Sequence, residues 1–366
     1  MKPCWWAGAP VKNSRFWGTV VVKLNLVERQ SGRQTGPKTV SPLSVIDAIS
    51  AGFDHVTRRP RLLLMPLALD VFLWMGPRLL AAPLADQLAR SSAQLAADLD
   101  ASSRIALQEM VSLMREMLSR VNLMSWLSVT GVGVPAANTG LDATKPLPTG
   151  SLPPIEHVPS LEAYLFVMIS LTLVGLMLAG LFWSMLAGSV RGDRFDVRHW
   201  LLDGLRVGLQ LVAVAALAIG LMLALAVPAS LLIVMLGSLS LGLASLVPAL
   251  LIAIMTWGIL FAVFTVHGLA LYRFSVQRAV VISGGVLRAF FSSTVGFVVL
   301  GLAIYIGLGL IWELIAADSW LRLIAMPGNA FVGTGLLVAS LHYYQDRTAI
   351  LFERLHWPQP LGNARG

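Results

Sequence analysis

Long apolar stretches without a charge constrain this chain more than any other feature of its sequence. The regions 161–187, 207–227 and 248–271 each contain a run of uncharged residues about as long as the roughly 20-residue helix that crosses a bilayer. No water is available inside the hydrocarbon layer, so every backbone amide must bond within its own segment and these stretches must be helical. The sequence therefore predicts an all-α, polytopic transmembrane helix bundle.

Six membrane spans are expected from the apolar pattern. They lie at approximately 62–82, 161–187, 207–227, 248–271, 294–317 and 326–345. With six spans, 20 of the 27 Lys and Arg residues lie on the side of both termini, as the positive-inside bias requires. This distribution favours a multi-pass protein of the plasma (inner) membrane with both termini cytoplasmic. The apolar segment 229–246, between Pro228 and Pro248, is then re-entrant or lies at the outer face, and a seventh span there is the alternative.

Basic amphipathic helices are expected on the cytoplasmic side before three of the spans. Apolar residues recur at three- and four-residue spacing in 43–59, 196–206 and 275–291, which is the pattern of a one-sided helix. Ser41 suits the N-cap of the first of them. Such helices lie in the headgroup layer and contact membrane lipids, either as simple connectors or as lipid-sensing and docking elements.

The two ends of the chain are expected to be cytoplasmic tails. Residues 1–41 hold seven Lys or Arg and one acid, which predicts a disordered basic tail, although a start codon placed too far upstream would give the same composition. No cleavable signal peptide is visible. The unit 42–82, an amphipathic helix followed by the first span, is then an uncleaved signal-anchor. The bundle proper is expected at 161–345 and a C-terminal tail at 346–366.

The region 83–160 is expected outside the membrane on the far side from the termini. Residues 84–130 predict a helical hairpin that turns near 101–103, and the six prolines of 131–160 predict a flexible or extended linker. Four methionines fall on one apolar stripe of this region: Met110, Met114, Met117 and Met124. Methionine adapts well to different contacts. The stripe is interpreted as packing on the first helix, as lying on the outer leaflet, or as docking a membrane-protein partner.

Two ionisable residues are expected inside or near the first span. Asp70 falls in its middle, where a carboxylate costs about 2.5–3.5 kcal/mol, and Arg78 lies two turns further on as a candidate water-mediated partner. The carboxylate is interpreted either as a helix–helix hydrogen bond or as a contact in a transporter or channel. Glu313 and Asp318, near the outer end of their span, would serve a third function, a lipid-modifying enzyme at the outer interface.

The sequence contains no motif of a known catalytic or cofactor site. It has no Walker A loop, H-E-x-x-H, G-x-S-x-G or G-x-G-x-x-G pattern, and its only cysteine, Cys4, rules out a multi-cysteine metal site. The +8 charge flanks apolar segments, which argues against nucleic acid. Gly204 and Gly208 match G-x-x-x-G but are a weak dimerisation face. We therefore expect a protein without enzymatic activity, cofactor or metal, with a structural or complex-assembly role.

Three segments carry a resemblance to a known family. The segments "SPLSVIDAISAGFDHVTRRPRLLLMPLALDVFLW", "SVQRAVVISGGVLRAFFSSTVGFVVLGLAIY" and "LHYYQDRTAILFERL" resemble bacterial multi-span proteins related to the membrane domain of glycerophosphodiester phosphodiesterases. The similarity covers residues 42–82 and 160–355 and implies amphipathic helices leading into spans. The long insertion at 83–160 departs from that pattern. The soluble phosphodiesterase domain is missing, so the resemblance does not imply that activity.

Overall fold

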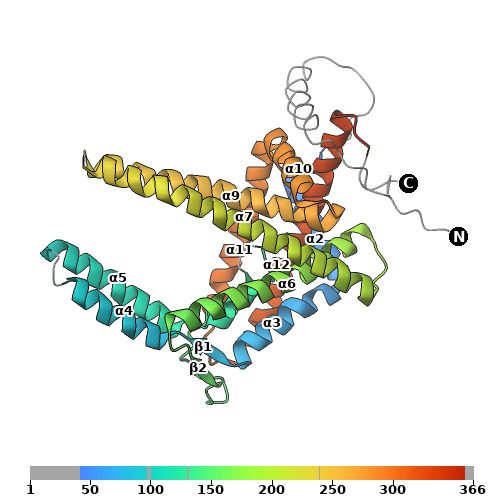
Figure 1. The fold of residues 1–366 in the computed structure, drawn as a ribbon. Coiled ribbons are helices and arrows are strands. Elements are labelled where there is room, and N and C mark those ends of the chain that lie inside the picture. Colours follow the sequence, from blue (N-terminus) through green and yellow to red (C-terminus); the bar gives the residue numbers. More distant parts are fainter. Residues whose placement is uncertain (1–41, 97–99, 130–131, 239, 359–366) are drawn as a thin grey trace.

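The computed structural model describes residues 42–96, 100–129, 132–238 and 240–358 (Figure 1). These residues form helices and two short strands. In chain order they are α2 Val45–Arg58, η1 Pro60–Leu63, α3 Leu64–Met75, β1 Arg78–Leu80, α4 Ala82–Leu95, α5 Ala101–Arg120, η3 Leu123–Ser128, β2 Ile155–His157, α6 Leu161–Arg191, α7 Val197–Gly237, α8 Leu241–Ala244, α9 Leu246–Tyr272, α10 Val276–Ala289, α11 Phe291–Glu313 and α12 Arg322–Arg354. The tail expected at 1–41 lies outside the described residues.

Five of the described helices are long and apolar enough to cross a membrane. They are α6, α7, α9, α11 and α12, with 31, 41, 27, 23 and 33 residues. Much of the surface of α7, α9 and α11 is exposed apolar side chain, as expected for helices that face acyl chains. The prediction of an all-α, multi-pass membrane protein is confirmed at this level.

The first expected span, at 62–82, is not one continuous helix. It is divided into η1 and α3, and α3 ends at Met75 after 12 residues, which is only about 18 Å of helix. Gly76 is extended, with ψ of 178°, and Pro77 follows it, so the helix cannot continue. The chain then forms β1, which pairs in parallel with β2. The expected boundary at residue 82 was wrong for this reason.

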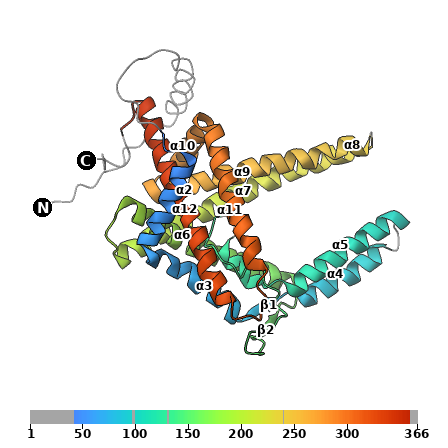
Figure 2. The same ribbon diagram turned by 180° about the vertical axis from the view of Figure 1, so that it is seen from behind.

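The segment α2–η1–α3 follows α12 along its length (Figure 2). At one end, the Leu43 amide donates to Asp346 at 3.1 Å and Arg347 donates to the Leu43 carbonyl at 2.8 Å. At the other end, the Trp74 indole N–H donates to the Ala317 carbonyl at 3.2 Å, just before α12 begins. The two contacts show that the broken helix runs antiparallel to a 33-residue helix.

Helix α2 packs inside the bundle, whereas the sequence predicted a place in the headgroup layer. Its N-cap is Ser44, whose hydroxyl accepts from the Asp47 amide at 3.1 Å, and not the expected Ser41. Ala48 and Val56 are fully buried. At Gly52 an added Cβ would lie 2.4 Å from the Gly335 carbonyl oxygen, so glycine is what permits this close crossing with α12.

Helices α7 and α9 form a long hairpin that projects from the bundle (Figures 1 and 2). The amphipathic helix expected at 196–206 and the span expected at 207–227 are one continuous helix with residues up to 237. The ambiguous segment 229–246 therefore supplies the last part of α7, all of α8 and the first residue of α9. Helices α7 and α9, which flank this segment, run side by side.

The two glycines of the G-x-x-x-G motif, Gly204 and Gly208 on α7, pack against α6 of the same chain. An added Cβ on Gly180 of α6 would lie 2.3 Å from the Gly208 amide nitrogen, and one on Gly204 would lie 2.4 Å from the Leu181 side chain. The glycines bring the backbones of α6 and α7 together, as small residues do in membrane helices. The motif thus holds the α6–α7 crossing.

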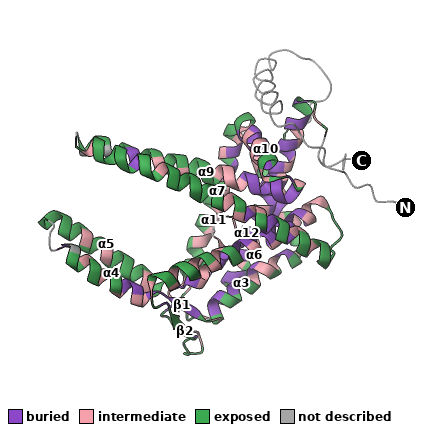
Figure 3. Ribbon diagram, in the orientation of Figure 1, coloured by how far each residue is buried: buried purple, intermediate pink, exposed green. Residues whose placement is uncertain are grey.

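The residues between β1 and α6 form an insertion, defined here as 81–160. Its helices α4 and α5 pack on each other and project from the bundle on the same side as α7 and α9 (Figure 1). Figure 3 shows burial concentrated in the bundle, while both projecting hairpins are largely exposed. The core lies where α2, α6, α9, α10 and α12 meet, around fully buried Trp183, Phe264, Tyr343 and Tyr344.

Candidate functional site

Asp70 joins the bundle to the insertion. Its side chain, on α3, is fully buried. The Asn138 amide donates to Asp70 Oδ1 at 2.9 Å, and the Asn138 side-chain amide donates to the Asp70 carbonyl at 3.1 Å. The carboxylate also interacts electrostatically with Arg322 at the start of α12. The hydrogen bond that the sequence predicted between two helices is thus made between α3 and a loop of the insertion.

Arg78 is a second attachment point for the insertion. Arg78 is the first residue of β1, and its side chain is buried, with 4% of its surface exposed. Its guanidinium group donates to the carbonyls of Ala143 and Lys145 at 2.7 and 2.5 Å. Burial in this loop lowers the pKa of Arg78, and the charge of Asp142 opposes that shift. The expected water-mediated pairing of Arg78 with Asp70 is not what the structure shows, because Arg322 is the cation beside Asp70.

The proline-rich linker is packed against the bundle over much of its described length. Val134, Ala136 and Asn138 are buried, and the indole N–H of Trp183 on α6 donates to the Val132 carbonyl at 2.6 Å. The Ser128 hydroxyl donates to the Val134 carbonyl at 2.7 Å. Within the flexible or extended linker predicted at 131–160, residues 132–138 are therefore held against the bundle, because the carbonyls of Val132 and Val134 find buried donors.

A cavity of about 870 Å³ opens between the insertion, the end of α11 and the start of α12. Its charged lining residues are Asp142, Lys145, Glu313, Asp318 and Arg322. Glu313 and Asp318, which the sequence analysis singled out, thus line the same cavity. Glu313 interacts electrostatically with Arg322. We call this space the insertion cavity.

Several buried polar atoms at the insertion cavity have no hydrogen-bond partner among the described residues. Those on residues that line the cavity are Trp312 Nε1, Arg322 Nε and Asn329 Nδ2, and Asp70 Oδ2 and Asn138 Oδ1 are also unpaired at the contact between α3 and the insertion. Burying such atoms unpaired costs about 1–3 kcal/mol each, and water or a polar ligand in the cavity would satisfy those that reach it. Asn138 and Arg322 were not singled out from the sequence, because neither follows a motif and both come from segments distant from Asp70.

The methionine stripe lies on the projecting hairpin. Helix α5 has no buried residue, and Met110, Met114 and Met117 are 53%, 41% and 64% exposed. Met124 is separate from them: α5 ends at Arg120, and Met124 lies in η3 against the bundle core. The stripe therefore comprises three of the four expected methionines.

An apolar groove of about 220 Å³ lies between α4 and α5 beside the stripe. It is lined by Ala85, Leu88, Ser91, Ser92, Leu107, Met110, Val111, Met114 and Arg115.

Helix α5 is capped at its start by Asp100, whose carboxylate accepts from the amides of Ser102 and Ser103 at 3.0 and 3.2 Å. Hydrogen bonds from these two serines hold the pKa of Asp100 well below its usual range, so this cap is charged at neutral pH.

The described residues contain no group of three or more His, Cys, Asp or Glu placed to hold a metal ion. Comparison with known proteins gives no match: no protein-family model, no curated protein and no solved structure is similar to the chain. The resemblance to the membrane domain of glycerophosphodiester phosphodiesterases stays a prediction. The fold and its sites define a multi-pass helical membrane protein with an insertion anchored to its bundle.

Proposed function

We propose that this protein is a membrane scaffold that holds a partner protein through the α4–α5 hairpin. The observation that carries the proposal is the uncovered apolar face of α5. Met110, Leu113 and Met117 lie there at helical spacing and are 53%, 63% and 64% exposed, and Met110 also lines the groove between α4 and α5. An apolar face of this kind on a rigid element marks an interaction site.

A protein fits this face better than the surface of a lipid leaflet. Helices that lie on membranes have polar faces rich in Lys and Arg, whereas α5 carries three Arg and two Glu. Two of the three arginines are already paired: Arg115 with Asp86 at 2.6 Å and Arg120 with Glu116 at 3.0 Å. Methionine side chains beside a groove receive an apolar helix face well. The proposed partner is therefore a protein with such a helix.

The proposed topology has six membrane crossings with both termini in the cytoplasm of a bacterial cell. Five crossings are the membrane-length helices. The sixth is the apolar segment from Leu62 through α3, and Arg58, Arg59 and Arg61 lie at its cytoplasmic end. The Lys and Arg distribution supports this orientation. It places the hairpin outside the cytoplasm, at the outer face of the inner membrane.

The hairpin proposal is tested by photo-crosslinking from position 113 in native membranes. We expect a crosslink to the same protein in independent preparations, and at least a tenfold loss of that protein from pull-downs when Met110, Leu113 and Met117 are changed to Ser. The matched control changes Gln108, Glu109 and Ser112 of the same helix to Ala. Crosslinks to lipid alone, to a second copy of this chain, or equally in both variants would contradict the proposal.

A transporter is the second candidate function, and the orphaned polar atoms at the insertion cavity favour it. A polar solute that enters this cavity would meet Arg322 and, beyond it, Asp70. The substitution Asp70→Asn keeps an oxygen for the Asn138 amide but removes the charge. Loss of proton-coupled uptake in reconstituted vesicles would support transport, and unchanged uptake would remove Asp70 from that mechanism. A lipid-modifying enzyme using Glu313 and Asp318 in the same cavity is the weaker alternative.

A further inference from the structure

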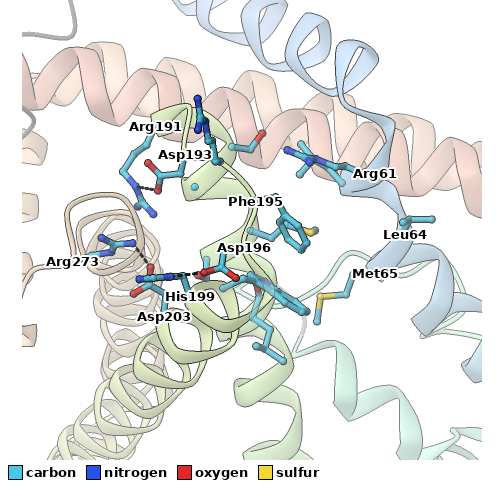
Figure 4. Close-up of a pocket in the computed structure, with 18 of the residues that line it drawn as sticks. Arg61, Leu64, Met65, Arg191, Asp193, Phe195, Asp196, His199, Asp203 and Arg273 are labelled. Carbon is cyan, nitrogen blue, oxygen red and sulfur yellow. Dashed lines mark hydrogen bonds and ion pairs between the residues drawn. The ribbon is translucent and has the colours of Figure 1, made fainter.

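A pocket of about 540 Å³ lies where α6 ends and α7 begins, far from the hairpin along the chain (Figure 4). One side is formed by Arg61, Leu64 and Met65 of η1 and α3. The other side is formed by the α6–α7 loop and the start of α7, with Arg273 after α9. We call it the α6–α7 pocket.

One part of the lining is apolar. It consists of Leu62, Leu64, Met65, Leu178, Leu181, Met185, Phe195 and Trp200. The only polar atom of the Trp200 ring, its N–H, is already used, because it donates to the Leu181 carbonyl at 2.9 Å. Exposed Leu201 and Leu205 continue the apolar surface along α7, so this wall passes into the surface that faces acyl chains.

Every acid in the lining has a cationic or histidine partner. Arg191 pairs with Asp193 at 2.9 Å, Arg273 pairs with Asp203, and the His199 ring nitrogen lies 2.6 Å from Asp196. The hydrogen bond from His199 is the main reason why the pKa of Asp196 lies below its usual range. Asp193 and Asp203 are therefore matched by arginines, and the four arginines of the lining outnumber its three carboxylates.

Two arginines are left without an acidic partner among the described residues. Arg61 lies over the Phe195 ring, 5.5 Å from its centroid, and makes no ion pair. Arg194 also lines the pocket and makes none. Two unpaired guanidinium groups at the edge of an apolar wall are complementary to a molecule that carries an anionic phosphate on an apolar chain.

We propose that the α6–α7 pocket binds an anionic phospholipid, with its phosphate at Arg61 and Arg194 and an acyl chain along the apolar wall. The excess of arginines over carboxylates in the lining favours an anion over a zwitterion, because Arg61 and Arg194 have no acidic partner among the described residues. The apolar wall favours a lipid over soluble phosphate, which would leave that wall without contacts. This site is independent of the hairpin and of its partner.

The test measures lipid binding to the purified, delipidated chain by native mass spectrometry. We expect phosphatidylglycerol to bind more tightly than phosphatidylcholine. The double variant Arg61→Gln, Arg194→Gln should weaken phosphatidylglycerol binding on the order of tenfold or more and abolish the preference. The matched control is Arg90→Gln, Arg198→Gln, which removes the same charge from exposed positions outside the pocket.

A third variant tests the apolar wall. Phe195→Ala should weaken the binding of phosphatidylglycerol while the preference over phosphatidylcholine is retained, and all variants should keep the melting temperature of the unaltered chain. Equal phosphatidylglycerol binding in the double variant and its control would overturn the proposal. Effective competition by glycerol phosphate would also overturn it, because it would show a site for soluble phosphate.

Discussion

At the scale of single residues, the buried charges of the bundle are used to hold the insertion. Burial of a lone charge is unfavourable unless hydrogen bonds compensate for the lost water. Asp70 receives such a bond from the Asn138 amide at 2.9 Å, and Arg78 donates to two carbonyls. Each residue therefore orders part of a loop that has little regular secondary structure of its own.

The role of Asp70 predicts different results for two substitutions. Asp70→Asn keeps an acceptor for the Asn138 amide, so we expect residues 134–140 to keep their protection from hydrogen exchange. Asp70→Leu leaves that amide unpaired, and we expect a loss of about 1–3 kcal/mol with fast exchange in the same segment. Equal protection in both variants would show that the Asn138 bond does not hold the loop.

The sequence pointed to Asp70 and Arg78 but not to their partners. Hydropathy alone marks an ionisable residue in an apolar segment as unusual. The partners lie 68 residues away for Asp70 and 65 residues away for Arg78, in a proline-rich stretch with no periodicity. No local pattern encodes such a contact, so the sequence left the choice between structural and functional roles open.

At the scale of elements, glycines decide which helices approach closely. Gly52 permits the crossing of α2 with α12, and the pair Gly204 and Gly208 permits that of α7 with α6. The sequence indicated amphipathic helices near 43–59 and 275–291, where the structure has α2 and α10. It did not show where the first apolar segment breaks, although Gly76-Pro77 was the available signal.

The crossing of α2 with α12 is tested by adding one methyl group. Gly52→Ala places a Cβ against the backbone of Gly335, and we expect a loss of about 1–3 kcal/mol through overpacking, seen as a lower melting temperature in detergent. Gly220→Ala is the matched control, since no atom lies within 4 Å of its Cβ in α7 and alanine favours a helix. Equal melting temperatures for both variants would contradict the close crossing.

At the scale of the whole molecule, a bundle carries two projecting hairpins that differ in character. The α7–α9 hairpin is apolar and suits the membrane, whereas the α4–α5 hairpin carries charges and an apolar stripe. The apolar runs were sufficient to predict the all-α class and the multi-pass bundle. The anchoring of the insertion depends on contacts between distant segments, and hydropathy holds no information about them.

Rigid mounting of the α4–α5 hairpin is the central claim, and a distance measurement between two spin labels tests it most directly. Cys4 is the only cysteine, so Cys4→Ser permits labels at cysteines introduced for Gln108 on α5 and Leu323 on α12. We predict one narrow distance distribution in lipid, which broadens when Arg78→Met removes an anchor. A broad distribution in the chain with Arg78 intact would contradict the account.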